Sequence, residues 1–143
     1  MYNPTREQSR RFLIEAWRKH VAKVPASGLE IVTADVIAMH PEYHALLASD
    51  DAIEREWTPE QGQTNPFLHL SMHLAIEEQL AIDQPPGLRA AFETLRTRTD
   101  RHTALHAVLD ALGEVMWRAQ RDNAPMDAAA YVEAVRCAVP PRL

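Results

Sequence analysis

The stretch NPFLHLSMHLAIEEQLAID, residues 65–83, is an apolar run that carries two histidines and an acidic residue at one regular spacing. Asn65 followed directly by proline indicates a helix start, because an asparagine side chain caps a first turn and proline fits its first position. His69, His73 and Glu77 are four residues apart, so an α-helix places them in a row along one face. If this row faces solvent, its side chains are ordinary surface groups, whereas a row that faces the core can take part in chemistry.

Polar residues on the opposite side of the same helix indicate that the row points into the protein. On a helical wheel Ser71 and Glu78 lie opposite His73, which makes that far side the expected solvent-facing strip. A buried carboxylate or imidazole without a partner costs roughly several kcal/mol, so each member of the row should have one. A divalent metal ion is a partner that satisfies imidazole and carboxylate groups together.

Composition favours an all-α fold. The chain has 143 residues, of which 46% are hydrophobic and 24% charged, as is ordinary for a folded soluble domain. Only four glycines occur, whereas alanine and leucine abound, and no segment shows the alternating pattern of a strand. We therefore predict a single domain over residues 1–143, built as a helical bundle with additional short helices.

The charge balance and the length of the apolar runs exclude several classes of protein. Net charge is −5, so the chain lacks the basic surface that nucleic-acid binding needs, and no nucleic-acid partner is expected. No segment approaches the roughly 20 apolar residues of a membrane span, and the charged N-terminal stretch does not resemble a signal peptide. Cys137 is the one cysteine, so no disulfide is possible within the chain. These features predict a cytoplasmic protein.

Capping residues and breaks divide the chain into the predicted helices. Thr5 begins a capping box, and Pro41 ends the helix before it because proline disfavours helical geometry in the preceding residue. A second break is expected at residues 97–100, where two threonines precede Asp100, a good N-cap. Trp117, beyond this break, is expected in the core. The predicted helices cover about residues 5–24, 28–40, 41–48, 66–83, 87–97, 101–121 and 127–138, with a loop at 49–64.

Two further histidine pairs repeat the spacing of four. The chain has seven histidines, and random placement would usually give no pair at this spacing. His102, His106 and Asp110 form a second row that again ends in a carboxylate, and His40 and His44 form a third pair. Repeated rows of this kind are typical of metal ligands that project from the facing helices of a bundle.

The two rows that end in a carboxylate are complementary if their helices pack antiparallel. The middle residues His73 and His106 would then face each other, and the first histidine of each row would face the carboxylate of the other. Six histidines and two carboxylates are too many for one tetrahedral ion, and a rise of about 6 Å per four residues separates the ends of each row. We therefore predict a two-metal site, with iron favoured and zinc next. Its candidate ligands are His40, His44, His69, His73, Glu77, His102, His106 and Asp110.

Four stretches of the chain resemble one known family. They are RRFLIEAWRKH (residues 10–20), HPEYHALL (40–47), NPFLHLSMHLAIEEQLAIDQPPGLR (65–89) and LGEVMWRAQR (112–121). Together they look like the family catalogued as domain of unknown function 1841, and the resemblance covers nearly the whole chain. It implies a small, bacterial, stand-alone protein and brings no ligand set, so the metal prediction rests on the spacing alone.

Two functions of different kinds fit this pattern. The first is a histidine-rich metal-binding bundle, similar in logic to hemerythrin-type di-iron bundles although its ligand order differs. Its metal would bind or activate a small molecule such as oxygen or peroxide. The second is a non-enzymatic interaction or structural module whose buried histidines form a hydrogen-bonded polar core. The sequence shows no further acid, base or substrate pocket, which leaves the reaction and the oligomeric state open, a homo-oligomer included.

Overall fold

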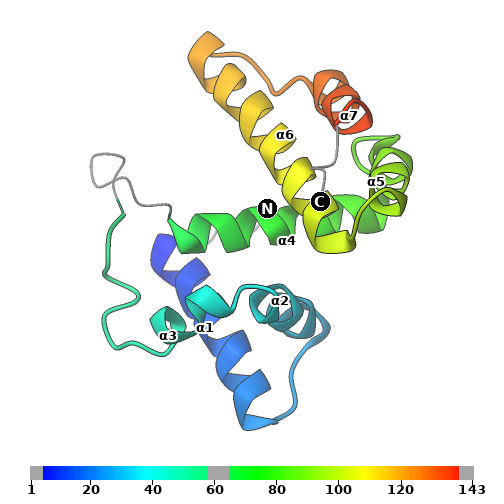
Figure 1. The fold of residues 1–143 in the computed structure, drawn as a ribbon. Coiled ribbons are helices and arrows are strands. Elements are labelled where there is room, and N and C mark those ends of the chain that lie inside the picture. Colours follow the sequence, from blue (N-terminus) through cyan, green and yellow to red (C-terminus); the bar gives the residue numbers. More distant parts are fainter. Residues whose placement is uncertain (1–4, 58–64, 139–143) are drawn as a thin grey trace. The chain divides into compact units, whose positions relative to one another are not determined.

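The computed structural model of the protein describes residues 5–57 and 65–138, and within these ranges it contains helices and no strand (Figure 1). The all-α prediction is therefore confirmed. Within the described part of the chain, no helix has the length and apolarity that crossing a bilayer requires. In chain order the elements are α1 (Arg6–Ala22), α2 (Gly28–Ala38), the 3-10 helix η1 (Pro41–Tyr43), α3 (His44–Leu47), α4 (Pro66–Ile82), α5 (Leu88–Thr97), α6 (Arg101–Asp122) and α7 (Ala128–Arg136).

The chain divides into two compact units, residues 1–74 and 75–143, and the division falls within α4. Such a division does not by itself separate domains, and the single domain over residues 1–143 stays a prediction. Of the predicted loop, residues 49–54 form turns and bends, residues 55–57 have no regular structure, and residues 58–64 lie outside the described residues.

In the first unit, capping boxes begin both long helices. The Thr5 hydroxyl accepts a hydrogen bond from the Gln8 backbone N–H at 3.1 Å, and the Gln8 side chain accepts one from the Thr5 N–H at 2.9 Å. Ser27 and Glu30 form the same arrangement at the start of α2. These bonds satisfy N–H groups that a helix leaves unpaired, which determines where each helix begins. The core of this unit includes Leu13, Val36, Ile37, Leu47, Phe67 and Leu70.

Arg10 ties the segment after α3 to α1. Its guanidinium Nη1 donates to the carbonyl oxygens of Ile53 and Arg55, at 2.7 Å each. The same guanidinium lies 4.7 Å from the centre of the Phe67 ring and 5.3 Å from that of Trp57. Because Arg10 is only 3% exposed, carbonyl dipoles and ring faces replace the water that this charge loses. The turns after α3 are therefore anchored to α1.

In the second unit, α5 and α6 are separate helices, as the sequence predicted. The Asp100 carboxylate caps α6 by accepting a hydrogen bond from the Thr103 N–H at 2.8 Å. Tyr131 of α7 is fully buried and donates its hydroxyl hydrogen to Gln79 Oε1 at 2.7 Å. The core here includes Leu88, Phe92, Leu95, Leu105, Val108 and Val135.

Trp117 does not lie in the core, contrary to the prediction. It is 56% exposed, and the Arg121 guanidinium lies over its ring, 4.9 Å from the centroid. The buried face of α6 near this point is formed by Leu112 and Val115. Trp117 follows Val115 by two residues, which turns its side chain about 200° around the helix to the opposite face.

Candidate metal centre

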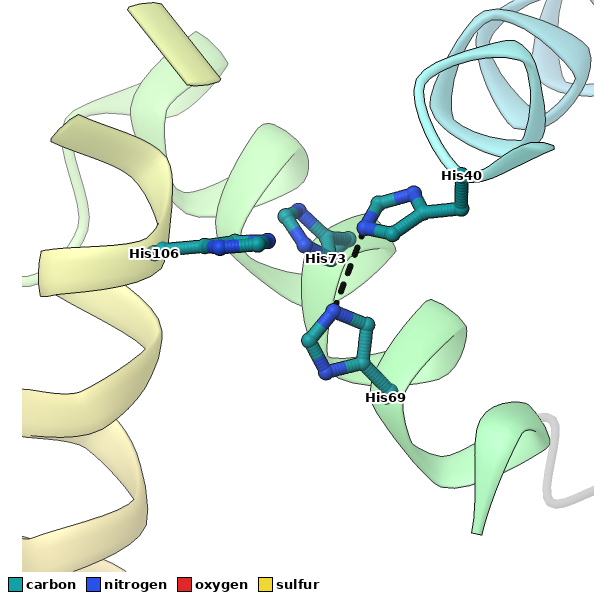
Figure 2. A group of neighbouring side chains, drawn as sticks. All are labelled: His40, His69, His73 and His106. Carbon is teal, nitrogen blue, oxygen red and sulfur yellow. Dashed lines mark hydrogen bonds between the residues drawn. The ribbon is translucent and has the colours of Figure 1, made fainter. Parts of the chain in front are cut away.

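Three histidines of the first unit bring their imidazoles together. His40 follows the end of α2, whereas His69 and His73 lie on successive turns of α4 (Figure 2). One ring nitrogen of each lies within 4.8 Å of a ring nitrogen of the other two. His40 is 1% exposed and His73 is 0% exposed, while His69 is partly buried. The histidines of α4 therefore face inward, as the polar residues on the opposite side of this helix predicted.

The position of His40 follows from the proline that succeeds it. Pro41 disfavours helical geometry at His40, whose backbone angles are φ −126° and ψ 66°, so the helical chain ends there. The Nδ1 atom of His40 lies 2.8 Å from the carbonyl oxygen of Val36, one turn earlier. Because a carbonyl oxygen can only accept, Nδ1 donates the hydrogen, and in the neutral imidazole Nε2 then carries the lone pair. This is the form of imidazole that binds a metal.

The Nε2 atom of His40 lies next to His69. The two Nε2 atoms are 3.1 Å apart, and His69 donates the hydrogen of the bond between them. Their rings cross at 78°, with centroids 4.9 Å apart. Two nitrogen ligands of one tetrahedral ion, each about 2.0–2.1 Å from it, are about 3.3 Å apart. The observed spacing therefore suits either a hydrogen bond between the imidazoles or an ion that both bind.

His73 approaches both of these rings at a steep angle. Its ring centroid is 4.7 Å from that of His40 and 4.8 Å from that of His69, and the ring planes cross at 65° and 64°. No two of the three imidazoles stack face to face (Figure 2). Imidazoles that converge from two segments of a helical protein are a donor set suited to a metal ion. We refer to His40, His69 and His73 as the histidine triad.

Tyr43 lies against the histidine triad, although the spacing of the histidines did not predict it. Its ring is nearly parallel to that of His40, at 6° with centroids 5.5 Å apart, and meets the His69 ring at 73° and 5.9 Å. Burial raises the pKa of the Tyr43 hydroxyl above its ordinary value of 10.0, so the phenol is neutral at physiological pH. The sequence order histidine, proline, glutamate, tyrosine at residues 40–43 is the signal that could have predicted this contact. A turn that follows the proline brings the tyrosine back toward the histidine.

His44, the other member of the third pair, has different contacts. Its Nε2 donates to the carbonyl oxygen of Ile37 at 2.9 Å, and its ring stacks on that of Trp17 with centroids 4.3 Å apart. Among the described residues, the group of close metal-donor atoms does not include it. Because the chain leaves helical geometry at His40 and begins α3 at His44, the spacing of four does not place this pair on one helix face.

Glu77 forms an ion pair within the second unit. Its two carboxylate oxygens lie 2.9 Å from Nη1 and 2.9 Å from Nη2 of Arg101, and its side chain is 17% exposed. The predicted antiparallel pairing of the two rows places His102 beside the Glu77 carboxylate. In the structure, the partner of Glu77 is Arg101, the residue before His102. Arg101 Nη2 donates a hydrogen bond to Oε2, whereas Oε1 forms an ion pair with Nη1 without hydrogen-bond geometry. The guanidinium therefore balances the charge of this carboxylate.

The second row lies on α6. His102 and His106 are partly buried, with ring centroids 4.2 Å apart, whereas Asp110 is exposed. The two histidines therefore share one face of α6, as the spacing predicted. The carboxylate that ends this row is accessible to water, which can satisfy it without a metal.

The chain belongs to the family described as "Domain of unknown function (DUF1841)", whose match covers residues 5–137. This membership confirms the resemblance seen in the sequence, and it assigns no activity to the histidine triad. Neither the comparison with curated proteins nor the comparison with solved structures gave a match.

Proposed function

We propose that the protein binds a metal, and that its first unit holds one divalent transition-metal ion on His40, His69 and His73. The convergence of three imidazoles from two chain segments carries this proposal, since one nitrogen of each lies within 4.8 Å of the others. Imidazole is a preferred ligand of zinc, copper, iron and nickel, whereas magnesium and calcium prefer oxygen ligands.

The orientation of His40 favours a metal over a purely hydrogen-bonded core. A metal-binding histidine usually donates its second ring N–H to a carbonyl or carboxylate, which orients the ring and fixes the position of its hydrogen. The bond from His40 Nδ1 to the Val36 carbonyl has this form.

We propose one ion in place of the two that the sequence favoured. In the part of the chain that the structure describes, one group of three or more close donor atoms occurs, and it contains no carboxylate. Glu77 is paired with Arg101, and Asp110 is exposed. Carboxylates are regular ligands of two-iron sites in helical bundles, so a site made of imidazoles alone is better suited to one ion.

The sequence also predicts His106, on α6, as a metal ligand, and this stays a prediction. It is the middle residue of the second row and is partly buried. Four imidazoles would complete a tetrahedral shell and give the ion a structural role, whereas three leave one position for water or a small molecule. The oxygen or peroxide chemistry considered from the sequence would need that open position and a redox-active metal.

Zinc is the ion that we propose first. Iron sites with open positions commonly combine two histidines with one carboxylate, whereas zinc is readily bound by imidazoles alone. The sequence favours iron through its similarity in logic to hemerythrin-type di-iron bundles, which use carboxylate ligands as well as histidines. With Glu77 paired to Arg101, iron becomes the second choice.

Titration of the metal-free, full-length protein with zinc, and anaerobically with iron(II), tests this proposal. We expect saturation at one ion per chain, with a Kd on the order of micromolar or lower. His73→Ala should bind about tenfold more weakly or worse, because it removes one ligand and opens the site. His20→Ala removes an exposed histidine of α1 and is the matched control, which should bind as the wild type does. A folded wild-type protein that binds neither ion would support the hydrogen-bonded polar core instead.

A further inference from the structure

We propose that Tyr43 is a positioning residue for the histidine triad, whose ring holds the His40 imidazole in the orientation that directs its Nε2 toward the other two histidines. This inference rests on the proposed metal site and names a residue that the site needs besides its ligands. It is carried by the two ring contacts of Tyr43 and by the turn that produces them.

The turn after α2 brings Tyr43 back onto His40. Pro41 occupies the first position of η1, where its fixed backbone angle suits a tight turn. The Tyr43 backbone N–H then donates to the carbonyl oxygen of His40 at 3.0 Å, which closes the turn. As a result the Tyr43 ring lies almost parallel to the His40 ring, at 6°. The two rings are therefore held together by backbone geometry as well as by their own attraction.

Two different contacts restrain the His40 ring. The hydrogen bond from Nδ1 to the Val36 carbonyl, at 2.8 Å, fixes one edge of the ring. The Tyr43 ring lies nearly parallel to the imidazole, with the ring centroids 5.5 Å apart, and restricts rotation of the imidazole out of its plane. Rotation about the Cβ–Cγ bond would break both contacts at once. The lone pair of Nε2 is thereby held beside His69, 3.1 Å away.

Tyr43 also touches the second segment of the site. Its ring meets that of His69 at 73°, with centroids 5.9 Å apart. It packs as well against the hydrophobic core of the first unit, so it has little freedom to move away. Tyr43 thus contacts one ligand from each of the two segments that form the histidine triad. Residues that orient ligands in this way typically change metal affinity by about 10- to 100-fold when they are replaced.

Zinc and cobalt(II) binding to metal-free, full-length variants tests the role of Tyr43. Tyr43→Phe keeps the ring and should keep the wild-type Kd. Tyr43→Leu keeps an apolar side chain but loses the flat ring, and we expect its Kd to rise about tenfold or more. The visible absorption of bound cobalt, which reports ligand geometry, should be shifted or weakened in Tyr43→Leu and unchanged in Tyr43→Phe.

A matched core variant separates positioning from general destabilisation. Leu46 packs on the same core, so Leu46→Ala should lower the unfolding temperature of the metal-free protein. It should still bind zinc with wild-type affinity and give the wild-type cobalt spectrum. Wild-type Kd and spectrum in Tyr43→Leu would overturn the inference while leaving the metal site intact, and so would an equal loss in Tyr43→Leu and Leu46→Ala. A wild-type protein that binds no metal would overturn both this inference and the proposed function.

Discussion

His40 and His69 are 29 residues apart in the chain, and their Nε2 atoms lie 3.1 Å apart. Two local features produce this contact. One is the end of the helical chain before Pro41, and the other is the start of α4, where the Asn65 side chain accepts a hydrogen bond from the Phe67 N–H at 3.0 Å. Both histidines are therefore placed by the ends of regular elements, which hold binding groups more accurately than loops do.

Removing an imidazole of the histidine triad should weaken zinc binding. His40→Ala and His69→Ala each delete one ligand, and we expect Kd to rise about tenfold or more in each. Competition with a chromophoric chelator measures this change. His20→Ala and Glu77→Gln are the controls, because His20 is exposed on α1 and Glu77 is paired with Arg101, and both should keep the wild-type affinity. Equal affinity in all four variants would rule out the triad as the site.

Metal removal should destabilise the folded protein. An ion that binds the folded chain and not the unfolded chain adds about 2.7 kcal/mol when its free concentration is about 100 times Kd. For a chain of this size that corresponds to roughly 5–10 °C in Tm. We expect a chelator to lower Tm by this amount and excess zinc to restore it, as measured by calorimetry. The Tm of His73→Ala should respond clearly less to chelator than that of the wild type, because its weaker binding adds less stability. A wild-type Tm that does not respond to chelator would contradict the prediction.

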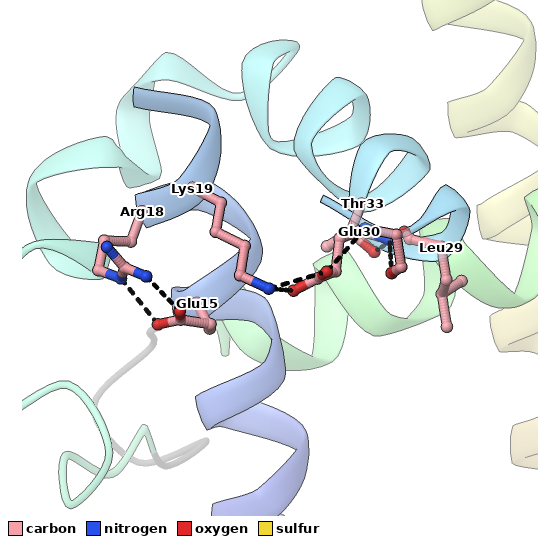
Figure 3. A network of polar contacts seen from close by, with 7 residues as sticks. Glu15, Arg18, Lys19, Leu29, Glu30 and Thr33 are labelled. Atoms are coloured by element: carbon pink, nitrogen blue, oxygen red, sulfur yellow. Dashed lines mark hydrogen bonds and ion pairs between the residues drawn. The ribbon is translucent and has the colours of Figure 1, made fainter. Parts of the chain in front are cut away.

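The ion pair between Lys19 and Glu30 should make stability depend on acid pH (Figure 3). The Lys19 ammonium, followed by the Ser27 backbone N–H, lowers the pKa of the Glu30 carboxyl from 4.5 to about 2. Because the folded-state pKa is the lower one, the pair stabilises the fold above about pH 4.5, and this contribution is lost as the pH falls toward 2. Glu30→Gln keeps a capping box and removes the charge. Its Tm should lie below that of the wild type at pH 7, and the difference should shrink below pH 4.5.

A second pair on α1 provides the control for this pH effect. Glu15 pairs with Arg18, but its side chain is 45% exposed, against 11% for Glu30 (Figure 3). Water and salt screen the more exposed pair, so Glu15→Gln should change Tm less. The measurements use metal-free protein, so that loss of metal in acid does not contribute. A difference between wild type and Glu30→Gln that stays the same from pH 7 to pH 3 would contradict the assignment.

Arg10 should contribute more to stability than its exposed neighbour. Arg10→Met keeps much of the side-chain volume but leaves the carbonyl groups of Ile53 and Arg55 without their charged donor. We expect the free energy of unfolding to fall by about 3 kcal/mol, measured by urea denaturation. Arg11→Met is the control, because Arg11 is 63% exposed and its pair with Glu7 should be worth under about 1 kcal/mol. Similar losses in the two variants would show that the carbonyl contacts are not important for the fold.

The helices were predictable because the signals that begin and end them are local. Asn65 and Asp100 accept hydrogen bonds from the first turns of α4 and α6, as their side chains and positions in the sequence indicate. The inward direction of His73 was predictable for a related reason, since Glu78 marks the solvent side of the same helix, and in the structure it is exposed while His73 is buried.

The contacts of the predicted ligands were not predictable from their spacing alone. One step along a helix turns a side chain by about 100°, so a small difference in packing puts Arg101 in place of His102 beside Glu77. His44 likewise does not share a helix face with His40, because the backbone leaves helical geometry at residue 40, and its Nε2 bonds to the Ile37 carbonyl instead. Tyr43 was missed because its contact with the site depends on the turn after α2, which has no helical periodicity to reveal it.

The metal content of the native protein tests the central claim most directly. The untagged protein, prepared without chelator or nickel resin, would be analysed by mass spectrometry of its elements, together with His73→Ala prepared in the same way. We expect about one transition-metal ion per chain in the wild type, zinc before iron, and a small fraction of that in His73→Ala. A folded wild-type protein with no bound metal, or one whose metal content His73→Ala retains in full, would contradict the account.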